Sequence, residues 1–220
     1  MIPDMKKTLY SLMLSEDVVR EVDALAHRMG ATRSGLINQI LAEYVGYTTP
    51  ERRISDVLSA VEQLLAPSRE LVPFFAPNSL SMSLKSSLEY KYRPTIKYEV
   101  ELYRTGGESI GSLSVVFRTQ SAPLLAAMTA FFRLWKRLED RYLAPVLPGY
   151  GLSYALYEGK FVRSIALPER DCTAEELAET ISGYVELLDK CMKAYLAGRA
   201  GETELAEAYR AWMAQQTLHI

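Results

Sequence analysis

Residues 7–46 hold one strand-like segment followed by two short amphipathic helices, which is too little chain to enclose a core of its own. In residues 7–14 the side chains alternate between the two faces of a strand. One face carries Tyr10, Leu12 and Leu14, and the other carries Leu9, Ser11 and Met13. A lone strand leaves its backbone groups unpaired, and the simplest partner is the same strand of a second copy. We therefore predict a homodimer joined by a two-stranded antiparallel ribbon.

Two helices are expected after this strand, and each ends at a glycine. Ser15 is a good N-cap for a helix that runs to about Met29, with acidic residues in its first turn. Gly30 then provides a typical C-terminal stop. A second helix begins at residues 31–34, and its apolar stripe ends at Gly46.

This order of elements resembles the ribbon-helix-helix (Arc/MetJ-type) DNA-binding domain, over residues 6–45 of the chain. The resemblance rests on Lys6-Lys7 before the strand, Leu14-Ser15-Glu16 at its end, Arg28-Met29-Gly30 at the end of the first helix, and Thr32-Arg33-Ser34-Gly35-Leu36-Ile37 at the start of the second. It implies that the paired strands enter the major groove of double-stranded DNA. The base-facing residues would be Lys7, Leu9, Ser11 and Met13. The amides at the start of the second helix, at Thr32, Arg33 and Ser34, would hold a phosphate.

The outward strand face departs from the family's usual pattern, because leucine and methionine replace hydrogen-bonding side chains at two of three positions. Such side chains touch a thymine methyl but make no bidentate hydrogen bond to a base. Residues 1–50 also carry five basic side chains against six acidic ones. Two alternatives therefore stay open: a protein-interaction or scaffold module that keeps the fold for dimerisation, and a DNA-processing accessory protein of a mobile element.

The whole chain has the composition of a globular protein, with 220 residues, 49% hydrophobic and 24% charged side chains, and a net charge of −2. A protein that coats nucleic acid without sequence preference usually has a marked basic excess, so DNA binding has to rest on a local surface. No apolar stretch is long enough to span a membrane, and the N-terminus has no apolar signal region. We expect a cytoplasmic protein without membrane contact.

A change of hydrophobic period separates the N-terminal module from the rest of the chain. We divide the chain into residues 1–48, the DNA-binding and dimerisation module; residues 49–78, a helix from about Ile54 to Leu65 and a linker; and residues 79–220, an assembly or effector-sensing domain. The expected elements of the last part are strands near 88–92, 96–102 and 113–117, a helix at 121–142, a hairpin at 152–167 that turns at Gly159, and helices at 173–196 and 202–215. The predicted fold class is α+β, with an antiparallel sheet covered by helices.

Aromatic side chains in this last part suggest a small-molecule pocket, although a plain sheet core uses the same residues. The candidates are Tyr90, Tyr92, Tyr98, Trp135 and Tyr154. An alternative contact for nucleic acid is a polar strand face whose basic residues, diluted by interleaved glutamates, are Lys85, Lys91, Arg93, Lys97 and Arg104. The remaining alternative is a domain for oligomerisation.

Enzymatic and metal chemistry have little support in the sequence. There is no phosphate-binding glycine motif and no nucleophile elbow, so we expect no catalytic residues and no cofactor. Cys172 and Cys191 are expected to be reduced thiols, and two histidines, His27 and His219, are too few for a metal site. The expected partners are double-stranded DNA, a second copy of the chain, and a small-molecule effector or a protein.

Overall fold

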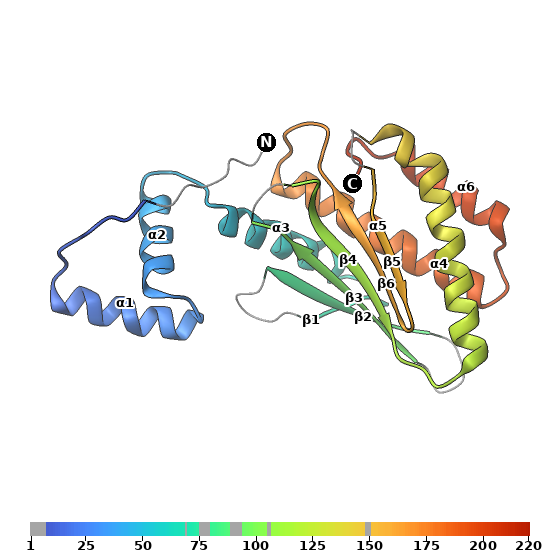
Figure 1. Cartoon of the computed structure of the whole chain (residues 1–220), viewed down its shortest axis with the longest axis horizontal. Coiled ribbons are helices and arrows are strands. Elements are labelled where there is room, and N and C mark those ends of the chain that lie inside the picture. Colours follow the sequence, from blue (N-terminus) through green and yellow to red (C-terminus); the bar gives the residue numbers. More distant parts are fainter. Residues whose placement is uncertain (1–7, 69, 75–79, 89–93, 105–106, 148–150) are drawn as a thin grey trace.

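The computed structural model describes residues 8–68, 70–74, 80–88, 94–104, 107–147 and 151–220 (Figure 1). Lys7, Tyr90 and Tyr92, which were expected to contact DNA or a ligand, lie outside these residues. The described chain contains helices and one antiparallel sheet, so the α+β class is confirmed. None of the described helices is both long enough and apolar enough to cross a membrane.

Six antiparallel strands form the sheet in the order β1-β2-β3-β4-β6-β5. They are β1 (Val72–Phe74), β2 (Ser81–Ser87), β3 (Thr95–Leu102), β4 (Ser109–Phe117), β5 (Tyr154–Tyr157) and β6 (Lys160–Ala166). The hairpin predicted at 152–167 is confirmed, with Gly159 at its turn in the left-handed region at φ 75°. Of the strand predicted near 88–92, residues 89–92 lie outside the described part of the chain, and the described strand before them, β2, ends at Ser87. Residues 66–78 were expected to be a linker, yet they contain β1.

The two faces of the sheet differ in character. Tyr98, Val115 and Phe161 lie side by side on the central strands β3, β4 and β6, and all three are buried. Helices cover this face (Figure 1). The other face is more polar, and its central part carries Ser81, Ser83, Lys97, Glu99, Glu101, Ser112, Ser114 and Lys160. This separation is the expected consequence of alternating side chains in an antiparallel sheet with one buried face.

The helices of this layer are α3 (Pro50–Leu65), α4 (Ala122–Tyr142), α5 (Ala174–Leu196) and α6 (Glu202–Met213), and the short 3-10 turn η1 (Ala144–Val146) follows α4. The helices predicted from Ser121 and Thr173 are confirmed, because each residue caps its helix through its side chain. Thr173 and Glu176 form the predicted capping box. The last helix, expected to end at residue 215, ends at Met213.

Helix α3 begins four residues earlier than predicted and belongs to the same core as the sheet. Thr49 is buried and accepts a hydrogen bond from the Arg52 amide, so that Pro50 takes the first helical position. The apolar face of α3, which includes Val57, Leu58 and Val61, joins the hydrophobic cluster under the sheet. The segment that was grouped with a linker therefore packs with the C-terminal part of the chain.

The N-terminal helices α1 (Glu16–Met29) and α2 (Arg33–Tyr44) form a pair that lies beyond one end of the sheet (Figure 1). Both helices occupy the predicted positions. Gly30 ends α1 in the left-handed region at φ 61°, as a C-terminal glycine does. The described residues of the predicted strand, 8–14, form no strand in the single chain.

Candidate functional site

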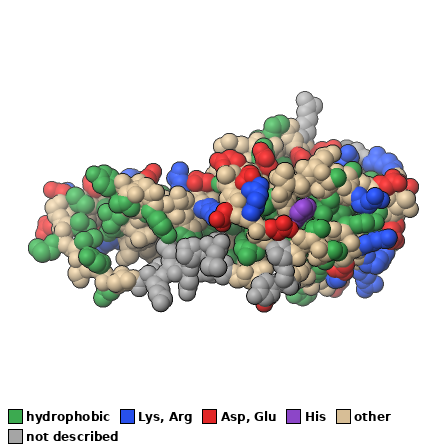
Figure 2. All heavy atoms as spheres, turned by 90° about the horizontal axis from the view of Figure 1, so that it is seen from above, with side chains coloured by type: hydrophobic (Ala, Val, Ile, Leu, Met, Phe, Trp, Pro, Cys, Tyr) green, Lys and Arg blue, Asp and Glu red, His purple; other side chains and the backbone are tan. Residues whose placement is uncertain are grey.

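The α1–α2 unit has almost no interior of its own. Within residues 8–48 the buried apolar side chains are Ala26, Leu36 and Ala42. The exposed large apolar side chains of the same region are Leu9, Tyr10, Leu12, Met13, Leu14, Val18, Ile40, Leu41, Tyr44, Val45 and Tyr47. They make up most of the large apolar side chains exposed in the described chain, and Figure 2 shows apolar side chains gathered at the end of the molecule that holds α1 and α2. A concentration of this kind marks an interaction surface.

The segment before α1 presents its two predicted faces unequally. Leu9 and Met13, on the predicted DNA face, have relative exposures of 95% and 102%. Leu12 and Leu14, on the predicted dimer face, have 55% and 44%. The alternation expected of a strand is therefore present in part before any partner is added, although Tyr10 on the dimer face is 83% exposed. Ser11, the remaining predicted base-facing residue, is also exposed.

The start of α2 carries the three residues predicted to contact phosphate, and all three are exposed. The Thr32 hydroxyl caps the helix by accepting a hydrogen bond from the Gly35 amide at 3.1 Å. The first amides of a helix have no partner within it and carry the positive end of its dipole. Helix α2 has no acidic side chain in its first turn, whereas α1 has Glu16 and Asp17 there. Thr32, Arg33 and Ser34 thus lie where an anion would be stabilised.

Arg33 also links α2 to α1. Its guanidinium donates to both carboxylate oxygens of Asp23 at 2.5 Å, in a bidentate pair. The hydrogen bond from Arg33 lowers the pKa of the Asp23 carboxyl below its ordinary value. The same contact partly neutralises Arg33, and the described N-terminal residues, 8–48, hold three arginines against five carboxylates. The net charge of these residues therefore provides no general attraction for a polyanion.

Of the aromatic residues predicted to line a pocket, the three that the structure describes, Tyr98, Trp135 and Tyr154, belong to the hydrophobic core or pack against it. The Tyr98 hydroxyl donates to the Asp189 carboxylate on α5 at 2.9 Å, and the Trp135 indole donates to the Tyr184 hydroxyl at 2.9 Å. Tyr98 and Trp135 are fully buried, and burial raises the pKa of Tyr98 well above its ordinary value. Tyr154, on β5, packs against Phe161 at a ring distance of 6.1 Å. They fill the space between the sheet and the helices, where a ligand would have to displace packed side chains.

Two features of the described structure were not foreseen from the sequence. A cavity of about 470 Å³ lies between the first turns of α3, the ends of β3 and β4, and residues 167–172 before α5. A buried ion pair joins Arg163 on β6 to Glu139 on α4. A polar edge on the cavity could have been predicted from the charged run Glu169-Arg170-Asp171, which directly precedes the capping box in the sequence. The buried charge could have been predicted from strand alternation, because Arg163 falls on the same face of the strand as the apolar Phe161 and Ile165.

Comparisons with protein-family models, with curated proteins and with solved structures find no match to this chain.

Proposed function

We propose that this chain is a homodimeric, sequence-specific DNA-binding protein and acts as a transcriptional regulator. Two copies of residues 8–14 would pair as a ribbon-helix-helix ribbon and enter the major groove. The observation that supports this best is the concentration of exposed apolar side chains on residues 9–47, beside helices that bury three apolar residues of their own. A unit of this size is stabilised by sharing its apolar surface with a second copy.

The dimer would use the two strand faces differently. Tyr10, Leu12 and Leu14 would be buried against α1 and α2 of both copies, where each large apolar side chain contributes about 1.5–3 kcal/mol. Leu9, Ser11 and Met13 would face the bases, with Ser11 as hydrogen-bonding group and the two apolar side chains against thymine methyl groups. This arrangement favours A·T-containing sites.

Phosphate contacts would set the register of the ribbon in the groove. In each copy the amides at the start of α2 would bind one phosphate, and the Arg33 guanidinium would approach the same phosphate from its position beside Asp23. The C-terminal sheet domain would serve in oligomerisation or in sensing a ligand.

The proposal is tested by titrating the full chain against fluorescent duplexes that tile its own promoter region, at several salt concentrations. Binding is expected to be selective for a few duplexes and to weaken steeply with salt. Arg33→Ala should weaken binding on every duplex. It should also reduce the slope of log binding constant against log salt concentration by about two, because each phosphate contact contributes about 0.9 and the symmetric dimer loses one contact in each copy. Arg20→Ala is the matched control: Arg20 also pairs with a carboxylate, Asp17 at 2.5 Å, but lies within α1. Equal losses in the two variants would refute the docking geometry.

The second candidate is an interaction module that keeps the dimer and does not bind DNA. The near-complete exposure of the apolar Leu9 and Met13 side chains, together with the acidic excess of residues 8–48, favours this function. Weak binding that is equal on all duplexes, from a protein that sediments as a dimer, would support the second candidate over the first.

A further inference from the structure

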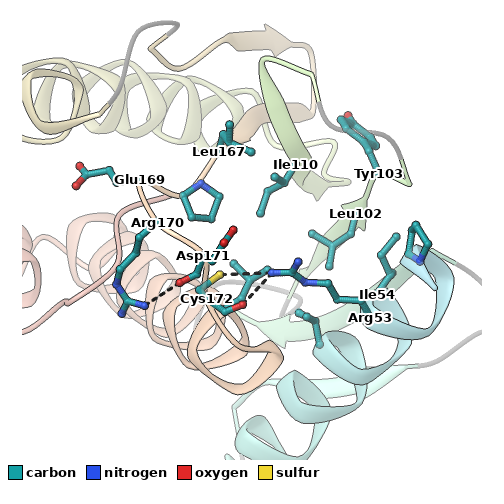
Figure 3. A pocket seen from close by; sticks show the side chains of 14 residues that line it. Arg53, Ile54, Leu102, Tyr103, Ile110, Leu167, Glu169, Arg170, Asp171 and Cys172 are labelled. Atoms are coloured by element: carbon teal, nitrogen blue, oxygen red, sulfur yellow. Dashed lines mark hydrogen bonds between the residues drawn. The ribbon is translucent and has the colours of Figure 1, made fainter. Parts of the chain in front are cut away.

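The cavity beside α3 has the size and lining of a small-molecule site (Figure 3). Its volume of about 470 Å³ falls in the range of ligand pockets, which are mostly apolar with a few polar groups. Apolar side chains from three parts of the fold line it: Ile54, Val57, Leu102, Ile110, Leu167 and Leu177. The cavity lies at the junction between the sheet domain and the start of α3.

Arg53 supplies a positive charge at this apolar lining. Its side chain is half-buried, and its guanidinium donates to the Cys172 carbonyl oxygen at 2.9 Å and lies 3.9 Å from the Cys172 sulfur. Within the described part of the chain, no carboxylate is paired with Arg53. Nearby arginines differ: Arg52 is paired with Asp56 at 3.0 Å and Arg170 with Glu176 at 2.7 Å. A guanidinium has five donor groups in a planar fork, so Arg53 keeps donors for a second acceptor.

The charges around Arg53 restrict the class of ligand. Glu169 and Asp171 also line the cavity, and the Glu169 side chain points away from Arg53 (Figure 3). Arg53 offers one positive charge with planar donors beside the apolar lining, which matches a single carboxylate group, so a monoanion fits better than a phosphate ester or a dicarboxylate. We propose that this cavity binds a small monocarboxylate with an apolar body, its carboxylate on Arg53 and its body against the apolar lining.

The position of the cavity connects such a ligand to the N-terminal module. Pro50, Arg53 and Ile54 belong to the first turns of α3, and residues 45–49 alone separate this helix from α2. A ligand held between Arg53 and residues 167–172 would fix the start of α3, from which the α1–α2 unit extends. In this respect the inference rests on the proposed function, because the ligand would then act as the effector of the regulator.

Cys172 provides a direct test, since this half-buried cysteine lines the cavity. Burial raises the pKa of the Cys191 thiol to about 11, so iodoacetamide near neutral pH should modify Cys172 first. The probe is octanoate, with octan-1-ol at equal concentration as the neutral comparison, and the rate of Cys172 alkylation is followed by mass spectrometry. Octanoate is expected to slow alkylation at concentrations at which octan-1-ol has little effect.

Arg53→Met should raise the octanoate concentration needed for protection by about tenfold or more, because a charge-assisted hydrogen bond is lost. Arg53→Lys should retain part of the protection. Arg52→Met is the matched control, since Arg52 lies one residue away, does not line the cavity, and should leave protection unchanged. Each variant is compared with and without octanoate, which removes any direct effect of Arg53 on thiol reactivity, and circular dichroism verifies its fold.

Three results would overturn the site: no protection by octanoate, equal protection by octan-1-ol, or equal losses in Arg53→Met and Arg52→Met. The effector role is tested separately by repeating the DNA titration with octanoate. A change in DNA affinity that is absent in Arg53→Met supports this role. Unchanged DNA affinity despite protection of Cys172 refutes the effector role and leaves the ligand site established.

Discussion

Glu139 and Arg163 form an ion pair between α4 and β6 in which both side chains have zero relative exposure. The Arg163 Nε donates to Glu139 Oε1 at 2.9 Å, and the same oxygen accepts from the Tyr184 hydroxyl at 2.8 Å. The guanidinium lies 4.4 Å from the centre of the Tyr184 ring and also donates to the main-chain oxygen of Ile220. Burial disfavours the charged guanidinium, yet the Glu139 carboxylate raises the pKa of Arg163 above its ordinary value. The ion pair joins the sheet to α4, and its hydrogen bonds and ring contact connect it to α5 and to residue 220.

Glu139→Gln removes the negative charge while keeping the volume, and leaves the Arg163 cation buried without its counter-ion. Removing one partner of a buried ion pair typically costs about 3–5 kcal/mol. Because domains are stable by about 5–15 kcal/mol, this is a large part of the free energy of unfolding. At about 2–4 °C per kcal/mol for a chain of this size, the melting temperature should fall by roughly 6–20 °C. The double variant Glu139→Leu with Arg163→Met replaces both charges by apolar groups and should recover most of the loss.

The assay is urea unfolding followed by far-ultraviolet circular dichroism, with equal m-values as the condition for comparing variants. Asp140→Asn is the matched control, because Asp140 follows Glu139 in the same helix and its pair with Lys136 is about half exposed. Breaking that surface pair should cost less than about 1 kcal/mol. Two results would refute the reasoning. One is an equal loss in the free energy of unfolding for Glu139→Gln and Asp140→Asn. The other is a double variant whose loss equals the sum of the losses in Glu139→Leu alone and Arg163→Met alone.

Two further predictions concern the sheet and the N-terminal helices. Gly111→Ala places a Cβ 2.2 Å from the Glu101 carbonyl oxygen and should destabilise the fold by about 1–3 kcal/mol, whereas Gly107→Ala meets nothing within 4 Å and should be nearly neutral in thermal unfolding. The pKa of Asp23 is lowered by its hydrogen bond from Arg33, so this pair stabilises α1–α2 above the unfolded-state carboxyl pKa and is lost as pH falls through the folded-state pKa. On acidification, amide hydrogen exchange in α1 and α2 of the native chain should therefore accelerate relative to the intrinsic exchange rate. In Asp23→Asn, which lacks the titrating carboxyl, the acceleration should be smaller. Identical pH profiles for the two proteins would contradict a stabilising role of the Asp23–Arg33 pair.

Local chemistry made much of the fold predictable. Ser121 and the pair Thr173–Glu176 fixed the starts of α4 and α5, because a cap satisfies orphan amides wherever the helix packs. Gly159 fixed the hairpin turn because glycine adopts the left-handed backbone conformation that this turn requires. The strand alternation assigned Tyr98 to one face, but could not distinguish a pocket wall from a packed core.

Features that depend on contacts between distant segments were not predictable. The Arg163 side chain is stable in the core only because α4 brings Glu139 to it, and the sequence shows no link between the two. The cavity arises where Arg53 meets residues 167–172, which lie far along the chain. The ribbon also depends on a distant contact, since its second strand would come from another molecule. It therefore stays a prediction.

The proposed dimer is tested most directly by the oligomeric state of the full chain, measured by sedimentation equilibrium for the native protein, Leu12→Asp and Met13→Asp. The two positions are adjacent but lie on opposite faces of the proposed ribbon, so the variants are matched in charge and differ in face. The native protein and Met13→Asp are predicted to be dimers. Leu12→Asp is predicted to dissociate, because it would bury a carboxylate in each half of the shared core. A monomeric native protein, or equal behaviour of the two variants, would contradict the proposed dimer.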